Sequence, residues 1–366
     1  MKTALYIHIP CCACKCPYCS FAVVSGKSFR EEAYLEALRI EADCRGGQDI
    51  VSLYVGGGTP SLLSEEGIER LNSLIEGYFS VGHGERVFEM NPESVTPAKA
   101  VLLKRLGFNR LSFGAQSFNL PYLSWLGRTH RPEKNFHAFD VLRAAGFDNI
   151  NVDLMFGFPG QTLKELCADI DALVSLGSEH VAVYALTVEE RSVFHVQGVC
   201  VSAEAQAELY QCACERLNAA GFRQYEVSNF ARPGLESRHN IHYWQGGDYV
   251  GLGMGAHSHF DGERSWNADT LPRYLAMIRS AGRAVAGQER LEPQARMMET
   301  LVFGLRMNAG VNIAGLEKRF DVVLAQDRRD EISRLIEGGF LIGNEMNIRA
   351  TGRGRLVLDE IAARLI

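Results

Sequence analysis

The sequence predicts an α/β protein built on an incomplete (β/α)6 TIM-type barrel, with a smaller, mostly helical C-terminal domain. Three observations favour this class: six short strand-like runs, helical stretches between them, and polar or glycine-rich clusters directly after nearly every run. Parallel strands need a crossover connection, so the alternation predicts a parallel sheet. The alternation becomes irregular after Leu186, which favours six units over the eight of a closed barrel.

The expected strands are rich in β-branched and aromatic residues. They are Ala4 to Ile9, Val51 to Val55, Arg86 to Met90, Arg110 to Phe113, Asn149 to Met155 and His180 to Leu186. The expected helices between them are Phe29 to Ala42, Glu65 to Tyr78, Pro97 to Leu106, Pro132 to Ala145 and Thr162 to Leu176. An open doubly wound sheet is the alternative. Because sites of barrel enzymes gather where strands end, the clusters after the strands favour the partial barrel.

Beyond the sixth strand the pattern changes. We expect a helix over Ala203 to Ala220, a strand over Gln224 to Ser228, and a mostly helical tail from Pro293 with a strand pair around Phe340 to Ile348. The expected domains are a barrel over 1–220, an extension over 221–290 and a winged-helix-like domain over 291–366.

Composition and charge exclude some classes of partner. The 366 residues are 46% hydrophobic and 22% charged, as is usual for a globular protein with a sizeable core. A net charge of −6 without a basic block argues against nucleic acid. We expect no integral membrane segment and a cytoplasmic location, because no run reaches 18 apolar residues and the N-terminus lacks an apolar signal region.

Five of the ten cysteines lie between positions 11 and 19, and such density in a cytosolic chain favours a metal or redox site over disulfides. Two CxxC pairs, Cys11 with Cys14 and Cys16 with Cys19, are separated by one residue, which leaves no chain to wrap a zinc ion. Cys12, Cys16 and Cys19 form CxxxCxxC instead. Three thiolates at this spacing suit three irons of a [4Fe–4S] cluster and leave the fourth iron open.

The CxxxCxxC motif follows directly after the first strand of a six-unit βα pattern. In this combination the chain resembles the radical S-adenosylmethionine (SAM) superfamily. The resemblance implies that SAM chelates the open iron and that a reduced cluster cleaves it to a 5′-deoxyadenosyl radical. It also implies an electron donor such as a flavodoxin or ferredoxin.

The loop Gly56 to Thr59 follows the second strand, and glycines let the main chain approach a ligand closely. A tight turn would show the same pattern. Carboxylates, amides and an arginine near later strand ends can hold ribose hydroxyls and the SAM carboxylate. With the resemblance, the candidate cofactor residues are Tyr6, Tyr18, Gly57, Gly58, Thr59, Glu89, Gln116, Arg128, Asp153 and Ala185.

The resemblance extends along nearly the whole chain. The stretches YIHIP, YVGGGTPS, FEMNPES, NRLSFGAQSFN, LGRTH, NVDLMFGFPGQT, YEVSNFARPG, SRHNIHYW and GLGMGAHS resemble the oxygen-independent coproporphyrinogen III oxidase-like group. Three features point to its heme-chaperone branch, the HemW type. Ser20 and Phe21 stand where the decarboxylases carry a further cysteine, the first strand begins at Ala4 without their extension, and HNIHYW matches the HNxxYW motif associated with heme binding.

The HNIHYW stretch can also be interpreted from its residues alone. Imidazoles at His239 and His242 could ligate heme iron, and Tyr243 and Trp244 offer flat surfaces to a macrocycle. The alternative is that the aromatic residues pack against the core while the histidines bond locally. The resemblance favours heme, with His239 the first candidate ligand and Asn240, Tyr243 and Trp244 beside it; the axial ligand stays open.

The expected function is a heme chaperone that binds heme, a [4Fe–4S] cluster and SAM and passes heme to an acceptor protein. One alternative is an oxygen-independent coproporphyrinogen III oxidase, which decarboxylates two propionate side chains. Another radical SAM reaction on a tetrapyrrole, such as ring opening of heme, is a further alternative. Whether the protein is also an enzyme is left open by the sequence.

Overall fold

The computed structural model describes residues 2–344 and 346–366, and its body is one large β-sheet. Six parallel strands lie side by side in chain order at its centre. They are β1 (Thr3–Ile9), β4 (Asp49–Gly57), β5 (Ser80–Met90), β6 (Arg110–Gln116), β7 (Ile150–Phe156) and β8 (His180–Ala185). The sheet does not close on itself, so the prediction of an incomplete six-unit barrel is confirmed.

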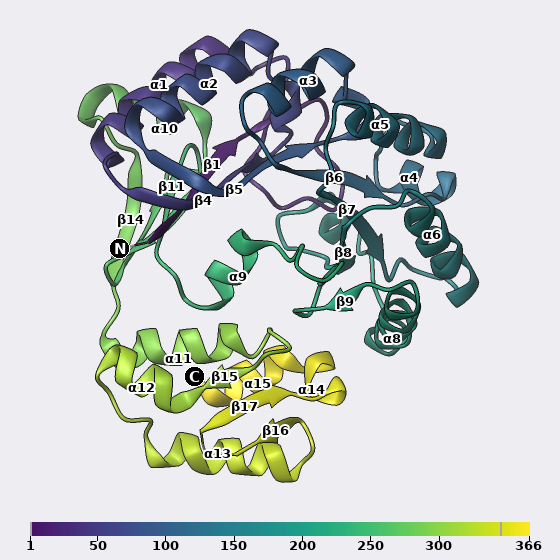
Figure 1. The fold of residues 1–366 in the computed structure, drawn as a ribbon, viewed down its shortest axis with the longest axis vertical. Helices are drawn as coiled ribbons and strands as arrows, with labels where there is room; N and C mark the ends of the chain where they lie inside the picture. The colour runs from purple at the N-terminus through teal and green to yellow at the C-terminus, as the bar shows by residue number, and fades with distance from the viewer. Residues whose placement is uncertain (1, 345) are drawn as a thin grey trace.

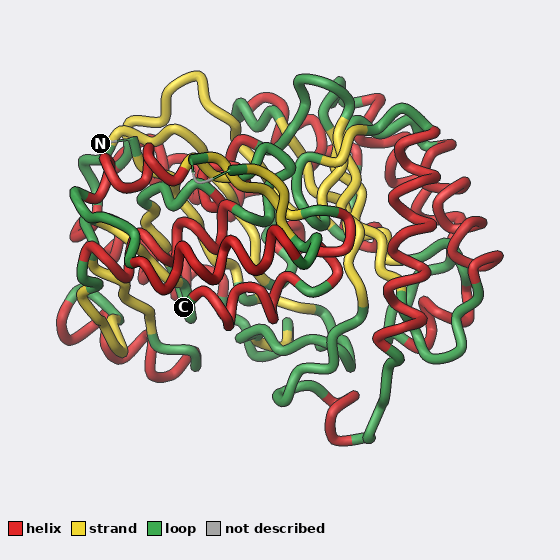
Figure 2. The backbone as a smooth tube through the Cα atoms, turned by 90° about the horizontal axis from the view of Figure 1, so that it is seen from below, coloured by secondary structure: helices red, strands yellow, loops and turns green. Residues whose placement is uncertain are grey.

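Helices connect the parallel strands and cover the outer face of the sheet (Figure 1). Those between the parallel strands are α1 (Glu31–Arg45), α2 (Glu65–Tyr78), α3 (Pro97–Arg105), α5 (Pro132–Ala144) and α6 (Leu163–Ser175), with short elements at η1 (Pro60–Leu62), η2 (Pro92–Ser94) and α4 (Leu120–Trp125). The helices α7 (Val193–Val196) and α8 (Ala203–Ala219) follow the last parallel strand. Several begin at side-chain caps; Thr162 and Glu165, for example, form a capping box that satisfies free N–H groups of α6. In Figure 2 the strands are seen from below among these helices.

Strands from later in the chain extend both edges of this sheet. At the β1 edge, β11 (Tyr249–Leu252) pairs parallel with β1. The antiparallel strands β12 (His257–Phe260), β13 (Glu263–Asn267) and β14 (Val285–Arg290) follow it, with α10 (Leu271–Ala281) between the last two. At the β8 edge lie β10 (Asn229–Ala231) and β9 (Arg223–Gln224).

The predicted strand over Gln224 to Ser228 is wrong. The ladder stops at Gln224 and resumes at Asn229, with only an isolated bridge at Glu226 between them. The buried carboxylate of Glu226 accepts hydrogen bonds from Ser228 N at 2.8 Å and from Asn229 Nδ2 at 2.5 Å. These local bonds give the backbone a turn in place of a ladder.

The C-terminal segment has its own apolar core, separate from that of the barrel. Its elements are α11 (Pro293–Gly304), β15 (Val311–Asn312), α12 (Ile313–Phe320), α13 (Gln326–Glu337), β16 (Leu341–Gly343), β17 (Asn347–Ala350), α14 (Gly352–Leu356) and α15 (Leu358–Leu365). β16 and β17 form the expected antiparallel pair; residue 345 between them lies outside the described residues.

The C-terminal segment contacts the body of the protein close to helix α9 (Arg238–Trp244). Asn308 Nδ2 donates to Gln224 O at 2.7 Å, and Arg319 donates to the carbonyl of Gln245, which follows α9. In Figure 1, α9 lies between the parallel strands and the C-terminal helices. Within the described part of the chain, no helix combines the length and apolar character needed to cross a membrane.

Candidate cluster and ligand sites

The cysteine loop is fixed at its base by two short strands. Cys11 and Cys12 form β2 (Cys11–Cys12), which pairs parallel with β3 (Val24–Ser25). Cys11 is buried in the barrel core, whereas Cys12, Cys16 and Cys19 are half-buried. The sequence CxxxCxxC therefore occupies a loop anchored at both ends, at the carboxyl end of β1.

A cavity of about 410 Å³ lies beside this loop; we call it the cluster cavity. It is lined by Cys12, Cys16 and Cys19, with Cys14 as well. Eight of the candidate cofactor residues line it too: Tyr18, Gly57, Gly58, Thr59, Glu89, Gln116, Arg128 and Asp153. Tyr6 lines a neighbouring cavity, and Ala185, at the end of β8, lines neither.

The donor chemistry of the loop suits an iron–sulfur cluster better than a single ion. Over residues 2–344 and 346–366, no three His, Cys, Asp or Glu side chains are grouped closely enough to hold one metal ion. Thiolates that ligate different irons of a [4Fe–4S] cluster lie farther apart than thiolates that ligate one ion. Three half-buried thiols on one cavity wall therefore fit such a cluster. Burial raises the pKa of the Cys12 thiol to about 11, so metal binding there is coupled to proton release.

Close packing requires glycine at position 57. Gly57 has φ of +116°, and a Cβ there would lie 2.4 Å from Nδ1 of the His8 imidazole. Its N–H donates to Glu89 Oε2 at 2.9 Å, while the hydroxyl of Tyr54 donates to Glu89 Oε1 at 2.6 Å. The glycine loop and the end of β5 are thereby joined by one buried carboxylate, whose pKa burial raises.

Arg128 places a guanidinium on the wall of the cluster cavity. Its Nη2 donates to Asn91 Oδ1 at 2.9 Å and to Gly114 O at 2.7 Å. Its buried Nε has no hydrogen-bond partner among the described residues. An incoming carboxylate could satisfy this donor. Asn91 was not among the sequence candidates, although it lies in the FEMNPES stretch after the third strand.

Asp153 lies at the same wall, on β7. Burial raises the pKa of its carboxyl to about 7, and the neighbouring Glu89 adds to this rise. Asn151 Nδ2 donates to Asp153 Oδ1 at 2.6 Å. A carboxyl with this pKa is partly protonated near neutral pH, so it can donate as well as accept a hydrogen bond from a hydroxyl-bearing ligand.

A second cavity, of about 880 Å³, adjoins the first; we call it the aromatic cavity. Phe21, Gly57 and Glu89 line both cavities. Its aromatic lining includes Tyr6, Tyr54, Tyr243, Tyr249 and Trp266, and His8, His239 and His257 also face it. Sequence reasoning missed Tyr54, Tyr249 and Trp266; His257 belongs to the GLGMGAHS stretch but received no role.

The HNIHYW residues lie on α9, and their side chains face two different regions of the protein. His239, Asn240 and Tyr243 line the aromatic cavity. Trp244 instead faces the C-terminal segment, where the guanidinium of Arg306 lies 4.5 Å from the centre of its ring. The structure therefore brings three of the four motif candidates to the cavity and directs the fourth to a domain contact.

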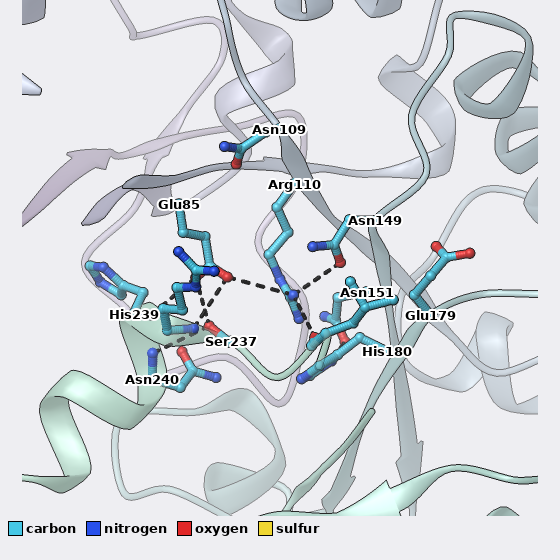
Figure 3. Close-up of polar contacts among 12 residues, drawn as sticks. Glu85, Asn109, Arg110, Asn149, Asn151, Glu179, His180, Ser237, His239 and Asn240 are labelled. Atoms are coloured by element: carbon cyan, nitrogen blue, oxygen red, sulfur yellow. Dashed lines mark hydrogen bonds and ion pairs between the residues drawn. The ribbon is translucent and has the colours of Figure 1, made fainter. Parts of the chain in front are cut away.

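A buried polar network holds α9 against the barrel (Figure 3). Glu85 accepts hydrogen bonds from Ser237 Oγ at 3.0 Å, His239 N at 3.0 Å and Arg238 N at 3.2 Å. Arg110 Nη1 lies 3.6 Å from Glu85 Oε2, and both side chains are almost fully buried. The network fixes the first turn of α9, because its free N–H groups bond to a carboxylate of β5.

Within this frame His239 is a buried, neutral imidazole. It is 3% exposed, its Nδ1 lies 2.9 Å from Ser52 Oγ, and its ring packs between those of Tyr54 and Tyr243. Burial lowers its pKa to about 3, and His242 adds to the lowering.

Comparison with known proteins defines the class. The family described as "Radical SAM superfamily" matches residues 6–173, and the "HemN C-terminal domain" matches residues 291–357. The solved structure of coproporphyrinogen III oxidase (HemN) from Escherichia coli shares the fold, with a TM-score of 0.88 at 23% identity, over 100% of this chain and 90% of that one. The fold and the cysteine loop are thus those of a radical SAM protein, a class that uses a [4Fe–4S] cluster and SAM.

Curated relatives narrow the class further. The heme chaperone HemW of Bacillus subtilis is 36% identical, over 99% of this chain and 98% of its own length. HemW of Mycobacterium tuberculosis is 34% identical over 99% and 94%, and the zebrafish (Danio rerio) mitochondrial radical S-adenosyl methionine domain-containing protein 1 is 31% identical over 100% and 87%. The chain belongs to the HemW family of radical SAM proteins.

Proposed function

We propose that this protein is a heme chaperone of the radical SAM type, which binds heme in the aromatic cavity and transfers it to an acceptor protein. One observation carries the proposal: an aromatic-lined space of about 880 Å³ adjoins the cluster cavity and includes three residues of the HNIHYW helix. Sites of this size with few polar groups suit a large planar ligand. Membership of the HemW family supports the same function.

In this proposal Cys12, Cys16 and Cys19 ligate the cluster. The SAM that completes it is held by the glycine loop, by Arg128 at its carboxylate, and by Glu89, Gln116 and Asp153 at its hydroxyl groups. The support is their common position on the walls of one cavity with the three thiols. A flavodoxin or ferredoxin would supply the electron, and the cytoplasm is the proposed location.

The cysteine assignment has a direct test with matched controls. Replacing Cys12, Cys16 or Cys19 with Ala is expected to abolish the broad iron–sulfur absorption of the anaerobically reconstituted protein. Cys11→Ala and Cys14→Ala are expected to keep it, because Cys11 is buried in the core and Cys14 lies outside the CxxxCxxC set. Equal loss of the cluster in all five variants would show that the ligand set is wrong.

The functional test uses the reconstituted, reduced protein under anaerobic conditions. It is incubated with SAM and with either heme or coproporphyrinogen III, and the products are separated by liquid chromatography. Stable heme binding, slow SAM cleavage and transfer of heme to an apo-acceptor are the expected results. A decarboxylated porphyrinogen would indicate an oxidase instead, and a linear tetrapyrrole would indicate ring opening.

A further inference from the structure

Among the described residues, one imidazole of the aromatic cavity is both exposed and free of hydrogen bonds, and it is not in the HNIHYW motif. Three histidines line this cavity: His8, His239 and His257. His8 has both ring nitrogens engaged, Nδ1 with the hydroxyl of Tyr6 at 2.9 Å and Nε2 with Ala22 O at 3.0 Å. Its ring cannot turn to a metal without losing both contacts.

His239 is enclosed in a different way. Its Nδ1 is held by Ser52, and Tyr54 and Tyr243 pack on its ring at centroid distances of 5.1 and 4.9 Å. Heme iron lies at the centre of a wide macrocycle, so a ligating nitrogen must reach the middle of a flat face. An imidazole that is 3% exposed between two tyrosine rings would have to displace one of these rings to meet such a face.

His257 meets the requirement. Its side chain is exposed to the cavity, and it makes no hydrogen bond with any described residue. It begins β12 directly opposite Trp266 on β13, and the two rings stack with centroids 6.2 Å apart and an interplanar angle of 27°. Burial and the charge of Arg264 lower the pKa of His257, which keeps a lone pair available at neutral pH.

The neighbouring strand leaves room for this pair of rings. Gly287 on β14 is the partner of Trp266, and a Cβ there would lie 2.3 Å from the indole. The indole therefore lies over the glycine, which supports the flat surface next to His257. Strand register thus presents an imidazole and an indole side by side at the cavity wall.

Charge at the mouth of the cavity fits the propionates of heme. Arg191 and Arg273 both line it. Arg191 lies 3.4 Å from Asp269, and both of these side chains are exposed, whereas Arg273 on α10 makes no ion pair with any described residue. A heme propionate could therefore pair with the Arg273 guanidinium without displacing another carboxylate of the described residues.

We propose that heme binds in the aromatic cavity with its iron on His257, its ring beside Trp266 and a propionate on Arg273, while the HNIHYW helix forms another part of the wall. This inference rests on the proposed function and specifies its ligand. The role of α9 is then positional: Asn240 and Tyr243 shape the cavity, and His239 is a packed part of its floor.

The test is a titration of hemin into the reconstituted protein and its variants, followed by difference absorption and resonance Raman spectroscopy. His257→Gly is expected to lose the histidine-ligated signature and to bind hemin at least tenfold more weakly, and added imidazole is expected to restore the signature. His257→Met, which keeps a ligand at the same place, is expected to give a thioether-type spectrum. His259→Gly, two residues along the same strand, is the matched control and is expected to resemble the wild type.

Arg273→Ala is expected to weaken hemin binding with the ligation signature unchanged. Two results would overturn the assignment of the iron ligand to His257 and leave the proposed function standing. One is an unchanged spectrum and hemin affinity in His257→Gly, and the other is loss of the ligation signature in His239→Gly with rescue by imidazole. Wild-type protein that fails to bind hemin would overturn the proposed function together with this inference.

Discussion

The Glu85–Arg110 pair offers a stringent test of how α9 is positioned. Both side chains are almost fully buried, and Glu85 is the acceptor for three donors at the start of α9. The perturbation is Glu85→Gln, which keeps the volume and one carbonyl oxygen but removes the charge. The expectation is a large loss of stability from a substitution that alters no packing.

The magnitude follows from the contacts of each oxygen. Oε1 accepts from Ser237 and His239, and Oε2 accepts from Arg238 N and faces Arg110. A glutamine that keeps the first oxygen places an NH₂ group against the Arg238 N–H and the Arg110 guanidinium. Each lost bond to a charged group is worth about 1.5 to 3 kcal/mol, and leaving a buried partner charge unpaired costs roughly 3 to 5 kcal/mol. We therefore expect the free energy of unfolding to fall by about 3 to 5 kcal/mol.

The assay is urea unfolding of the reconstituted protein under anaerobic conditions, followed by circular dichroism. Glu133→Gln is the control, because its partner Arg131 lies 3.6 Å away and both side chains are more than 70% exposed. The control should change stability by less than about 1 kcal/mol. A loss in Glu85→Gln that is no larger than in the control would refute the reasoning. It would mean that the hydrogen bonds of Arg110 to Asn149 Oδ1 and Leu235 O are enough to hold its charge.

Two further predictions concern the cluster cavity. Gly57→Ala is expected to destabilise the protein by about 2 kcal/mol or more, because the added Cβ would meet the His8 ring at a residue with positive φ. The control is Gly77→Ala on α2, where the space around the glycine is open and the substitution should stabilise by up to about 1 kcal/mol. Similar unfolding midpoints for the two variants would contradict this prediction. The folded-state pKa of the Asp153 carboxyl, about 7, lies above its unfolded value, so this group contributes stability at low pH that is lost as the pH rises through 7. In Asp153→Asn the fall in unfolding free energy between about pH 4 and pH 7 should therefore be smaller than in the wild type. Equal slopes of unfolding free energy against pH would show that burial beside Glu89 does not raise this pKa.

The sequence by itself determined the six-strand alternation and the cysteine loop. Both follow from local patterns: apolar runs of strand length, helical spacing between them, and CxxxCxxC directly after the first run. Because parallel strands end at a common edge, the sequence also indicated that Gly57, Glu89 and Asp153 would lie near one another, and they line one cavity. Sequence reasoning failed at Gln224 to Ser228, where side-chain bonds of Glu226 ended a ladder that the pattern favoured.

Only the tertiary structure decided what surrounds the HNIHYW helix. The pairing of β11 with β1 joins residues more than 240 positions apart in the chain, and no local pattern specifies such a partner. That pairing places His257 and Trp266 in the wall of the cavity that α9 also lines. Ser52, Tyr54 and Tyr243 bury His239, the imidazole that the motif favoured. A motif identifies which residue types are present, whereas exposure and free hydrogen-bonding atoms depend on packing between distant segments. The choice between His239 and His257 is therefore a property of the fold.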